Sequence, residues 1–209
     1  QFSGFLLPGG FSYQDRIRAG VISAKLPLIQ SLKHQSLTTK KPILGICNGA
    51  QILIESGILS SYGTLDQIID YNYVDDQRIG FMSDWGFLTP FNPTQNVFLS
   101  NLSEDDVLPI QICHGEGRFL FSNAPMSGLK YTTIDGQETG LFPTTPNGST
   151  DNIAAVSNDA GNILAIMPHP ERSITPTRYP LSIRTYAKNN HLNLVNFSIL
   201  FHAFKEPTQ

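Results

Sequence analysis

The chain has 209 residues, of which 40% are hydrophobic and 15% charged, so it can bury a full core and lacks the composition of a disordered protein. Its formal net charge of -3 gives no electrostatic reason to expect nucleic acid or an anionic membrane surface as a partner. No apolar run approaches the roughly 20 residues of a membrane span, so we expect a soluble protein that forms one domain over residues 1–209.

The two cysteines, Cys47 and Cys113, stand far from any Cys-x-x-Cys spacing and outside any cluster of metal ligands. This pattern predicts neither a disulfide framework nor a metal site. A reducing cytoplasm is the compartment that fits best.

The first third of the chain predicts a strand, a turn and a helical region. Residues 2–7 are typical of a strand, and Pro8-Gly9-Gly10 ends it in a turn with free backbone amides. Apolar residues then recur at helical spacing over 17–32, although Pro27 predicts a kink or a second helix that begins there. Lys40-Lys41-Pro42 ends the helical region.

The next segment predicts a strand, a sharp turn and a helix. Residues 43–46 are a short apolar strand, and residues 50–56 are typical of a helix that closes on Gly57. Cys47 lies in the turn between them.

The second half predicts mostly strands. An irregular strand-like region over 72–109 is followed by a strand over 107–113, which leads into the polar loop 114–118. A hairpin is predicted from 153–156 and 163–167, and an amphipathic terminal helix from 192–203.

The strongest motif is Gly45-Ile46-Cys47-Asn48-Gly49. Glycines on both sides of a nucleophile permit the sharp strand-to-helix turn of Gly-x-Ser-x-Gly hydrolases, here with a thiol in place of the hydroxyl. The turn would expose the sulfur near a helix N-terminus, whose partial positive charge favours a thiolate. The alternative is a buried structural cysteine between two incidental glycines.

His169 and Glu171 lie two residues apart in Met167-Pro168-His169-Pro170-Glu171-Arg172. That spacing suits a base and the carboxylate that orients it, if the segment is extended, and predicts a Cys-His-Glu triad. Backbone amides of the Pro8-Gly9-Gly10 loop, which only its glycines supply, could hold an oxyanion together with the Asn48 amide. Taken singly, residues 167–172 and residues 8–10 could each instead be an ordinary surface turn.

The loop His114-Gly115-Glu116-Gly117-Arg118 has too few ligands for a metal site, and its glycines do not form a phosphate-binding pattern. Contact with a substrate, or a role in the loop itself, fits it better. Cys113, just before the loop, is most simply a buried small hydrophobe.

Together these motifs, with Phe11-Ser12-Tyr13 after the first turn, resemble the class I (triad) glutamine amidotransferases. More narrowly, Phe-Ser-Tyr, Cys-Asn-Gly and His-Gly-Glu-Gly-Arg resemble the glutaminase of phosphoribosylformylglycinamidine synthase. The match runs in order from Phe5 to about Arg172. It implies a flavodoxin-like α/β fold, a three-layer sandwich with a mostly parallel central sheet.

The resemblance also implies roles for individual residues. Cys47 would be the nucleophile, His169 its acid and base, and Glu171 the group that orients the histidine. The backbone amides of Gly10 and Asn48 would hold the oxyanion. The residues expected to bind glutamine are Gly9, Gln51, His114 and Gly115.

The resemblance further implies a partner. Ammonia would pass to a separate synthetase subunit, which uses ATP and Mg to convert formylglycinamide ribonucleotide into its amidine. This chain would carry no cofactor or metal of its own, and a small bridging subunit would complete the assembly. The chain alone should be poorly active.

Two departures from the family pattern stand out. The family has a strand, loop and helix before the position of Gln1, so we expect that an N-terminal piece is missing from this sequence. Gln14 stands where the family motif has glycine.

Three alternatives remain open. The chain could serve another acceptor within the same class, or be a cysteine-dependent hydrolase of similar fold, against which His-Pro-Glu argues. It could also be a non-catalytic regulatory relative, which the presence of all three triad residues disfavours.

Overall fold

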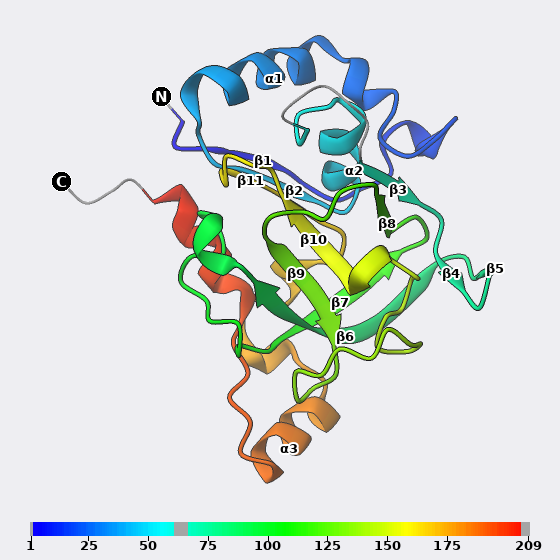
Figure 1. The fold of residues 1–209 in the computed structure, drawn as a ribbon, viewed down its shortest axis with the longest axis vertical. Coiled ribbons are helices and arrows are strands. Elements are labelled where there is room, and N and C mark those ends of the chain that lie inside the picture. The colour runs from blue at the N-terminus through cyan, green and yellow to red at the C-terminus, as the bar shows by residue number, and fades with distance from the viewer. Residues whose placement is uncertain (1, 61–66, 206–209) are drawn as a thin grey trace.

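A seven-stranded sheet runs through the molecule in the order β1-β2-β11-β10-β9-β6-β7 (Figure 1). The computed structural model describes residues 2–60 and 67–205. The sheet strands are β1 (Phe5–Leu7), β2 (Ile43–Ile46), β6 (Met82–Phe91), β7 (Leu108–His114), β9 (Gly128–Thr132), β10 (Ile153–Ser157) and β11 (Ile163–Ile166). Two small two-stranded sheets pair β3 (Gln67–Asp70) with β8 (Arg118–Phe121), and β4 (Tyr73–Val74) with β5 (Gln77–Arg78).

The strands β1, β2 and β11 form a parallel half of the sheet. Ile43 of β2 aligns with Phe5 on one side and with Ile163 on the other. All four residues of β2 and of β11 are buried, as expected for aliphatic strands covered on both faces. The carboxyl ends of these three strands therefore meet at one edge of the sheet.

The strands β10, β9, β6 and β7 form an antiparallel half, so the predicted mostly parallel sheet is mixed in the structure. Only the β1–β2 and β2–β11 pairs are parallel, whereas the other four neighbouring pairs are antiparallel. The predicted hairpin is confirmed, since β10 pairs with β11 around the turn at 158–161. Short turns of this kind join antiparallel strands, whereas parallel neighbours need a long crossover.

Helix α2 (Asn48–Glu55) covers one face of the parallel half. Leu7 and Gly45 face it, because a Cβ added at Gly45 would lie 2.5 Å from Leu53 Cδ1. Successive side chains of a strand alternate between faces, and Leu6 accordingly lines a cavity with Phe201 on the other face. The 3-10 segment η7 (Phe197–Phe204), which carries Phe201, thus forms the third layer.

Helix α1 (Pro27–Thr39) begins at Pro27, as the second of the two predicted options has it. The helix expected before Pro27 is wrong, because residues 16–22 turn and only a short 3-10 helix, η2 (Ser23–Lys25), follows. Gly20 has a φ of +81°, and a Cβ there would lie 2.9 Å from the backbone of Gln51 and Ile52. At Gly20 the chain therefore packs closely against α2 and does not continue as a helix.

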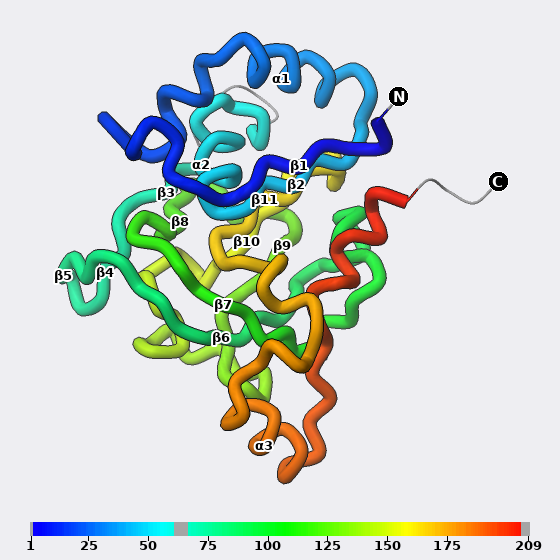
Figure 2. The backbone as a smooth tube through the Cα atoms, turned by 180° about the vertical axis from the view of Figure 1, so that it is seen from behind, coloured from blue at the N-terminus to red at the C-terminus, as the bar shows by residue number. Residues whose placement is uncertain are grey.

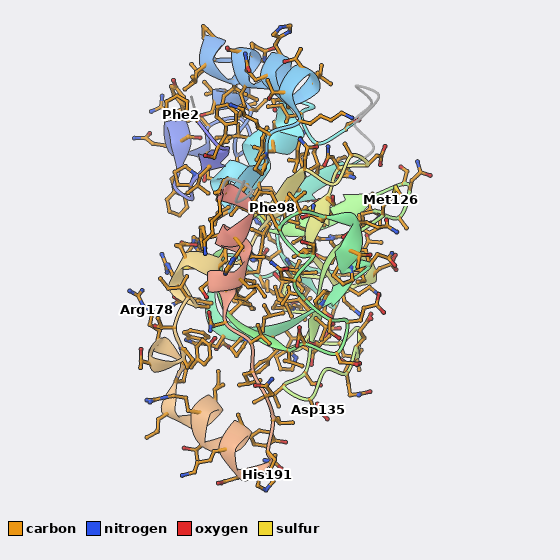
Figure 3. All side chains as sticks on the ribbon, turned by 90° about the vertical axis from the view of Figure 1, so that its left-hand side faces the viewer. Phe2, Phe98, Met126, Asp135, Arg178 and His191 are labelled. Atoms are coloured by element: carbon orange, nitrogen blue, oxygen red, sulfur yellow. The ribbon has the colours of Figure 1, made fainter. Side chains whose placement is uncertain are left out.

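The C-terminal region also differs from the expectation. The apolar pattern of 192–203 predicted an α-helix, but the segment is the 3-10 helix η7, and Leu194 before it forms a bridge with Val107. Helix α3 (Leu181–Asn189) was not predicted. It projects from the body at the end opposite α1 and α2 (Figures 1 and 2), and the labelled His191 lies at the tip of this projecting end in Figure 3.

The remaining short 3-10 segments lie in connections between strands and helices. They are η1 (Ser12–Asp15), η3 (Pro93–Gln95), η4 (Thr150–Asn152), η5 (Pro170–Arg172) and η6 (Pro176–Arg178).

Candidate active site

Cys47 lies at the junction of β2 and α2 in a strained backbone conformation. Its φ is 50° and its ψ is -109°, a region that residues with a side chain rarely adopt. Its N–H donates to the carbonyl of Ile166 over 2.8 Å, which continues the pairing of β2 with β11. The predicted sharp strand-to-helix turn is therefore present, with the cysteine at the N-cap position of the helix. The expectation that the turn exposes the residue is wrong, because Cys47 is only 7% exposed.

The glycines of the motif permit this turn because strand and helix approach closely. A Cβ on Gly49 would lie 2.0 Å from the carbonyl oxygen of Leu7, closer than any real contact. A Cβ on Gly45 would lie 2.8 Å from the carbonyl oxygen of Gly49. The reading of these glycines as incidental is thereby excluded on steric grounds.

His169 follows β11 and contacts Glu171 directly. The two atoms His169 Nδ1 and Glu171 Oε1 are 2.6 Å apart. The backbone dihedral angles of His169 are not helical. Pro170 begins the 3-10 turn η5, which brings the Glu171 carboxylate back to the His169 ring. The segment is thus bent rather than extended, and the bend itself makes the contact.

Charge around this pair raises the pKa of the histidine. Burial by itself lowers the pKa of His169, but hydrogen bonds to Cys47 and Glu171, together with their charges, raise it to about 10. For Glu171, burial has the opposite effect and raises the pKa, but the hydrogen bond to His169 holds the pKa below its ordinary value. The imidazole is therefore held in its protonated form beside the sulfur.

The three triad residues line one cavity of about 350 Å³. Gly9 lies between two of them, since a Cβ there would be 3.0 Å from His169 Cε1 and 3.4 Å from Cys47 Cβ. Gly10 lines the same cavity. The structure thus brings together the predicted nucleophile, its histidine and carboxylate, and the predicted oxyanion loop.

A second cavity of about 160 Å³ is also lined by Cys47. Its lining includes the remaining predicted glutamine-binding residues, Gln51, His114 and Gly115, and also Gly10. It is more polar in character than the first, which contains Leu6, Ile46 and Phe201. Cys47 therefore lines two cavities that differ in polarity.

A series of hydrogen bonds ties the three site loops together. Ser12 N donates to Asn48 Oδ1 over 3.2 Å, Asn48 Nδ2 donates to Gln51 Oε1 over 3.0 Å, and Gln51 Nε2 donates to the carbonyl of Glu116 over 2.8 Å. Both ends of the Gln51 amide are thus engaged within the protein. Gln51 therefore helps to hold the loop that follows β7.

The sheet curls so that its far edge returns to the site. Gln111 of β7 forms an antiparallel bridge with His169, and His169 N donates to the Gln111 carbonyl over 2.9 Å. The carbonyl oxygen of Cys113 consequently lies 3.9 Å from Cys47 Sγ. Cys113 is partly exposed and lines both cavities, which corrects its prediction as a buried residue.

Several site residues were missed by sequence reasoning. Asp15 and Glu116 line the second cavity, and burial is the main cause that raises the pKa of each. Phe11 and Phe81 line both cavities, with ring centroids 6.4 Å apart. Phe11 and Phe81 are far apart in the sequence, so no local pattern indicated that they pair. Glu116, by contrast, lies within the 114–118 motif.

The described residues hold neither a cluster of metal ligands nor a membrane-spanning helix. Within residues 2–60 and 67–205, no group of three or more His, Cys, Asp or Glu side chains could hold a metal ion. Over the same ranges, every helix is too short or too polar to span a bilayer.

Comparisons with known proteins show the family of this chain. A family described as CobB/CobQ-like glutamine amidotransferase domain matches residues 1–200. Phosphoribosylformylglycinamidine synthase subunit PurQ of Methanothrix thermoacetophila is 37% identical over 194 residues, covering 86% of this chain and 74% of the relative. The PurQ subunit of Methanocaldococcus jannaschii is 38% identical over 180 residues, or 82% and 72% of the two chains.

A solved structure shares the fold. The structure of PurLQS from Thermotoga maritima matches with a TM-score of 0.69 and 28% sequence identity, over 90% of this chain and 80% of that one. The predicted α/β amidotransferase fold is thereby confirmed, with its mixed sheet curled around the site. The chain belongs to the CobB/CobQ-like glutamine amidotransferase family and, within it, to the PurQ subunits of phosphoribosylformylglycinamidine synthase.

Proposed function

We propose that this chain hydrolyses glutamine through Cys47, His169 and Glu171 and delivers the ammonia to a synthetase subunit. The observation that carries the proposal is the 2.6 Å contact between His169 Nδ1 and Glu171 Oε1, in a cavity that the strained Cys47 also lines. Nucleophile, acid–base group and orienting carboxylate in one cavity are the arrangement that covalent acyl transfer requires.

In the first half of the reaction, Cys47 Sγ attacks the carboxamide carbon of glutamine and the carbonyl oxygen becomes an oxyanion. The backbone amides of Gly10 and Asn48 stabilise that charge, Asn48 being the first residue of α2. His169 gives its proton to the nitrogen, the carbon–nitrogen bond breaks, and ammonia leaves. A glutamyl thioester remains on Cys47.

In the second half, His169 has lost its proton and acts as a base. It removes a proton from water, whose oxygen attacks the thioester carbon, and the carbon–sulfur bond breaks to release glutamate. Glu171 holds the ring so that Nε2 faces the reacting atoms, because its Nδ1 is occupied by the carboxylate. The cycle restores Cys47 and the protonated histidine.

The acceptor follows from the relatives, which are named as subunits of phosphoribosylformylglycinamidine synthase. We assign the ammonia to the conversion of formylglycinamide ribonucleotide into formylglycinamidine ribonucleotide in purine biosynthesis. A large synthetase subunit would use ATP and Mg for this step, and a small bridging subunit would join the assembly, in line with the PurLQS complex of the related structure. Two free cysteines fit a cytoplasmic enzyme.

The test is to measure ammonia released from glutamine by the purified chain, with and without the synthetase subunit and its nucleotide substrate. We expect slow hydrolysis by the chain alone and strong stimulation when the partner, the ribonucleotide and ATP are present. Stimulation by a synthetase for another acceptor, and none by this one, would contradict the purine assignment.

A further inference from the structure

Asn72 is fully buried and holds the loop after β7 from both sides. Its Nδ2 donates to the carbonyl oxygens of Gly80 over 3.2 Å and His114 over 2.8 Å. Its Oδ1 accepts the N–H of Gly117 over 3.0 Å. Carbonyl oxygens only accept and backbone N–H groups only donate, so these three bonds fix which end of the Asn72 amide is the oxygen.

This orientation in turn fixes the tautomer of His114. The atoms His114 Nδ1 and Asn72 Oδ1 are 3.2 Å apart, and because the oxygen only accepts, Nδ1 must carry the proton. Burial, followed by the charge of His169, lowers the pKa of His114 to about 3, so the ring is neutral. In a neutral imidazole the second nitrogen is an acceptor, and Nε2 therefore presents a free lone pair.

That lone pair belongs to a side chain of the second cavity. His114 is only 3% exposed, and its Nε2 is buried without a hydrogen-bond partner among residues 2–60 and 67–205. The side chain lines the cavity of about 160 Å³ together with Cys47 and Gln51. A buried acceptor left unpaired costs free energy, so a ligand that brings a donor into this cavity gains by pairing with it.

Gly117 completes the arrangement by leaving room for the ring. A Cβ on Gly117 would lie 2.2 Å from both Nδ1 and Cε1 of His114. The His114 ring therefore packs directly against the backbone at Gly117. Its position depends on the conformation of this loop.

We propose that Asn72 is a positioning residue that holds His114 as a hydrogen-bond acceptor for an N–H group of glutamine. The inference rests on the proposed glutaminase function and adds to it a residue and a polarity. Glutamine brings two such groups, the carboxamide and the α-ammonium. Glutamate, the product, has lost the carboxamide N–H.

A pair of substitutions at His114 separates this role from a structural one. The side-chain amide of glutamine reaches the position of Nε2, whereas that of asparagine reaches only the position of Nδ1. We expect His114→Gln, in the complex with the synthetase, to keep most of kcat/KM for glutamine, and His114→Asn to lose about tenfold, mainly through KM, as for one lost hydrogen bond. The reverse order would mean that only the bond to Asn72 matters and would overturn the proposal.

A second measurement tests Asn72 itself, with Asn147 as the matched control. Asn147 is also fully buried, and its Nδ2 donates to the Gly117 carbonyl over 2.6 Å rather than to His114. Long-range ¹H–¹⁵N NMR should show His114 protonated at Nδ1 in the unaltered chain and in Asn147→Leu, and partly at Nε2 in Asn72→Leu. An Nε2-protonated ring in the unaltered chain would refute the tautomer and with it the proposal.

Glutamate γ-methyl ester identifies the donor, because it keeps the α-ammonium and lacks the carboxamide N–H. If His114→Asn impairs glutamine but not the ester, the carboxamide is the partner; equal impairment assigns the α-ammonium. Failure of the proposed function is seen separately, as an unaltered complex that releases no ammonia from glutamine, while the NMR result still reports on His114.

Discussion

The parallel and antiparallel halves of the sheet contribute to the site in different ways. β1, β2 and β11 are short, and the segments that follow them bring Pro8, Cys47 and His169 to the triad cavity. In the antiparallel half, β6 alone spans ten residues, and only β7 ends at the site. The first half places the reacting groups, and the second half encloses them.

The comparison shows why the two halves depend on each other. Counting strand directions across the sheet, β7 runs the same way as β11, so His114 emerges at the same edge as Cys47. The bridge between Gln111 and His169 then joins the two halves beyond that edge. Changes in the parallel half should abolish chemistry, whereas those in the antiparallel half should weaken binding.

The largest effect is expected from Cys47→Ala in the parallel half. Glutamine-dependent synthesis by the complex should fall by at least about 10³-fold, because the nucleophile is gone. Synthesis from added ammonia should persist, since the synthetase is untouched. Cys113→Ala in the antiparallel half should lower the glutamine-dependent rate only several-fold, because its main-chain carbonyl is what faces the sulfur. Loss of both glutamine- and ammonia-dependent synthesis in Cys47→Ala would indicate a structural role instead.

Next in size is the effect of a methyl group at matched glycines. Gly49→Ala places Cβ 2.0 Å from the rigid backbone oxygen of Leu7 and should lower the free energy of unfolding by about 3 kcal/mol or more. Gly86→Ala in β6 meets only Ile112 Cδ1, at 2.9 Å, a side-chain end that can move, and should cost less than about 1 kcal/mol. Urea unfolding of both variants measures the difference, and equal losses would refute the close approach at Gly49.

A smaller effect is expected from Glu171→Gln, which keeps the shape and removes the charge. The rate of glutamine hydrolysis should drop by roughly 10²-fold, the lower end of acid–base contributions. Because the contact with Glu171 raises the pKa of His169, its loss lowers that pKa and the protonated ring persists over a narrower pH range. The alkaline limb of the kcat profile should therefore move to lower pH, and an unmoved limb would show that Glu171 does not set the charge of His169.

The sequence was sufficient for features that depend on neighbours along the chain. Gly45 and Gly49 flanking Cys47 predicted the turn, and the two-residue spacing of His169 and Glu171 allowed the contact that the structure shows. Pro27 predicted a kink or a helix start, and the structure has the start, because the proline ring fits the first turn of a helix. The turn at 158–161 predicted the hairpin.

Features made by the curl of the sheet were not predictable in this way. Asn72 and His114 are 42 positions apart, and no local pattern indicates that they meet. The antiparallel order likewise depends on long-range pairing, such as that of β6 with both β7 and β9. At 192–203, the apolar spacing predicted a face that includes Leu200, which is buried, but it left out the equally buried Phe197. It also did not distinguish the 3-10 helix of the structure from an α-helix.

The backbone angles of Cys47 also bear on how this chain can change over evolutionary time. A φ of 50° with a ψ of -109° is tolerable for glycine, whereas a residue with a side chain pays on the order of 1–3 kcal/mol there. Mutation to glycine at this one position would thus relax the fold while ending the reaction. Under the proposed function, selection for ammonia release keeps the cysteine in place, and a lineage freed from that selection would gain stability by replacing it with glycine.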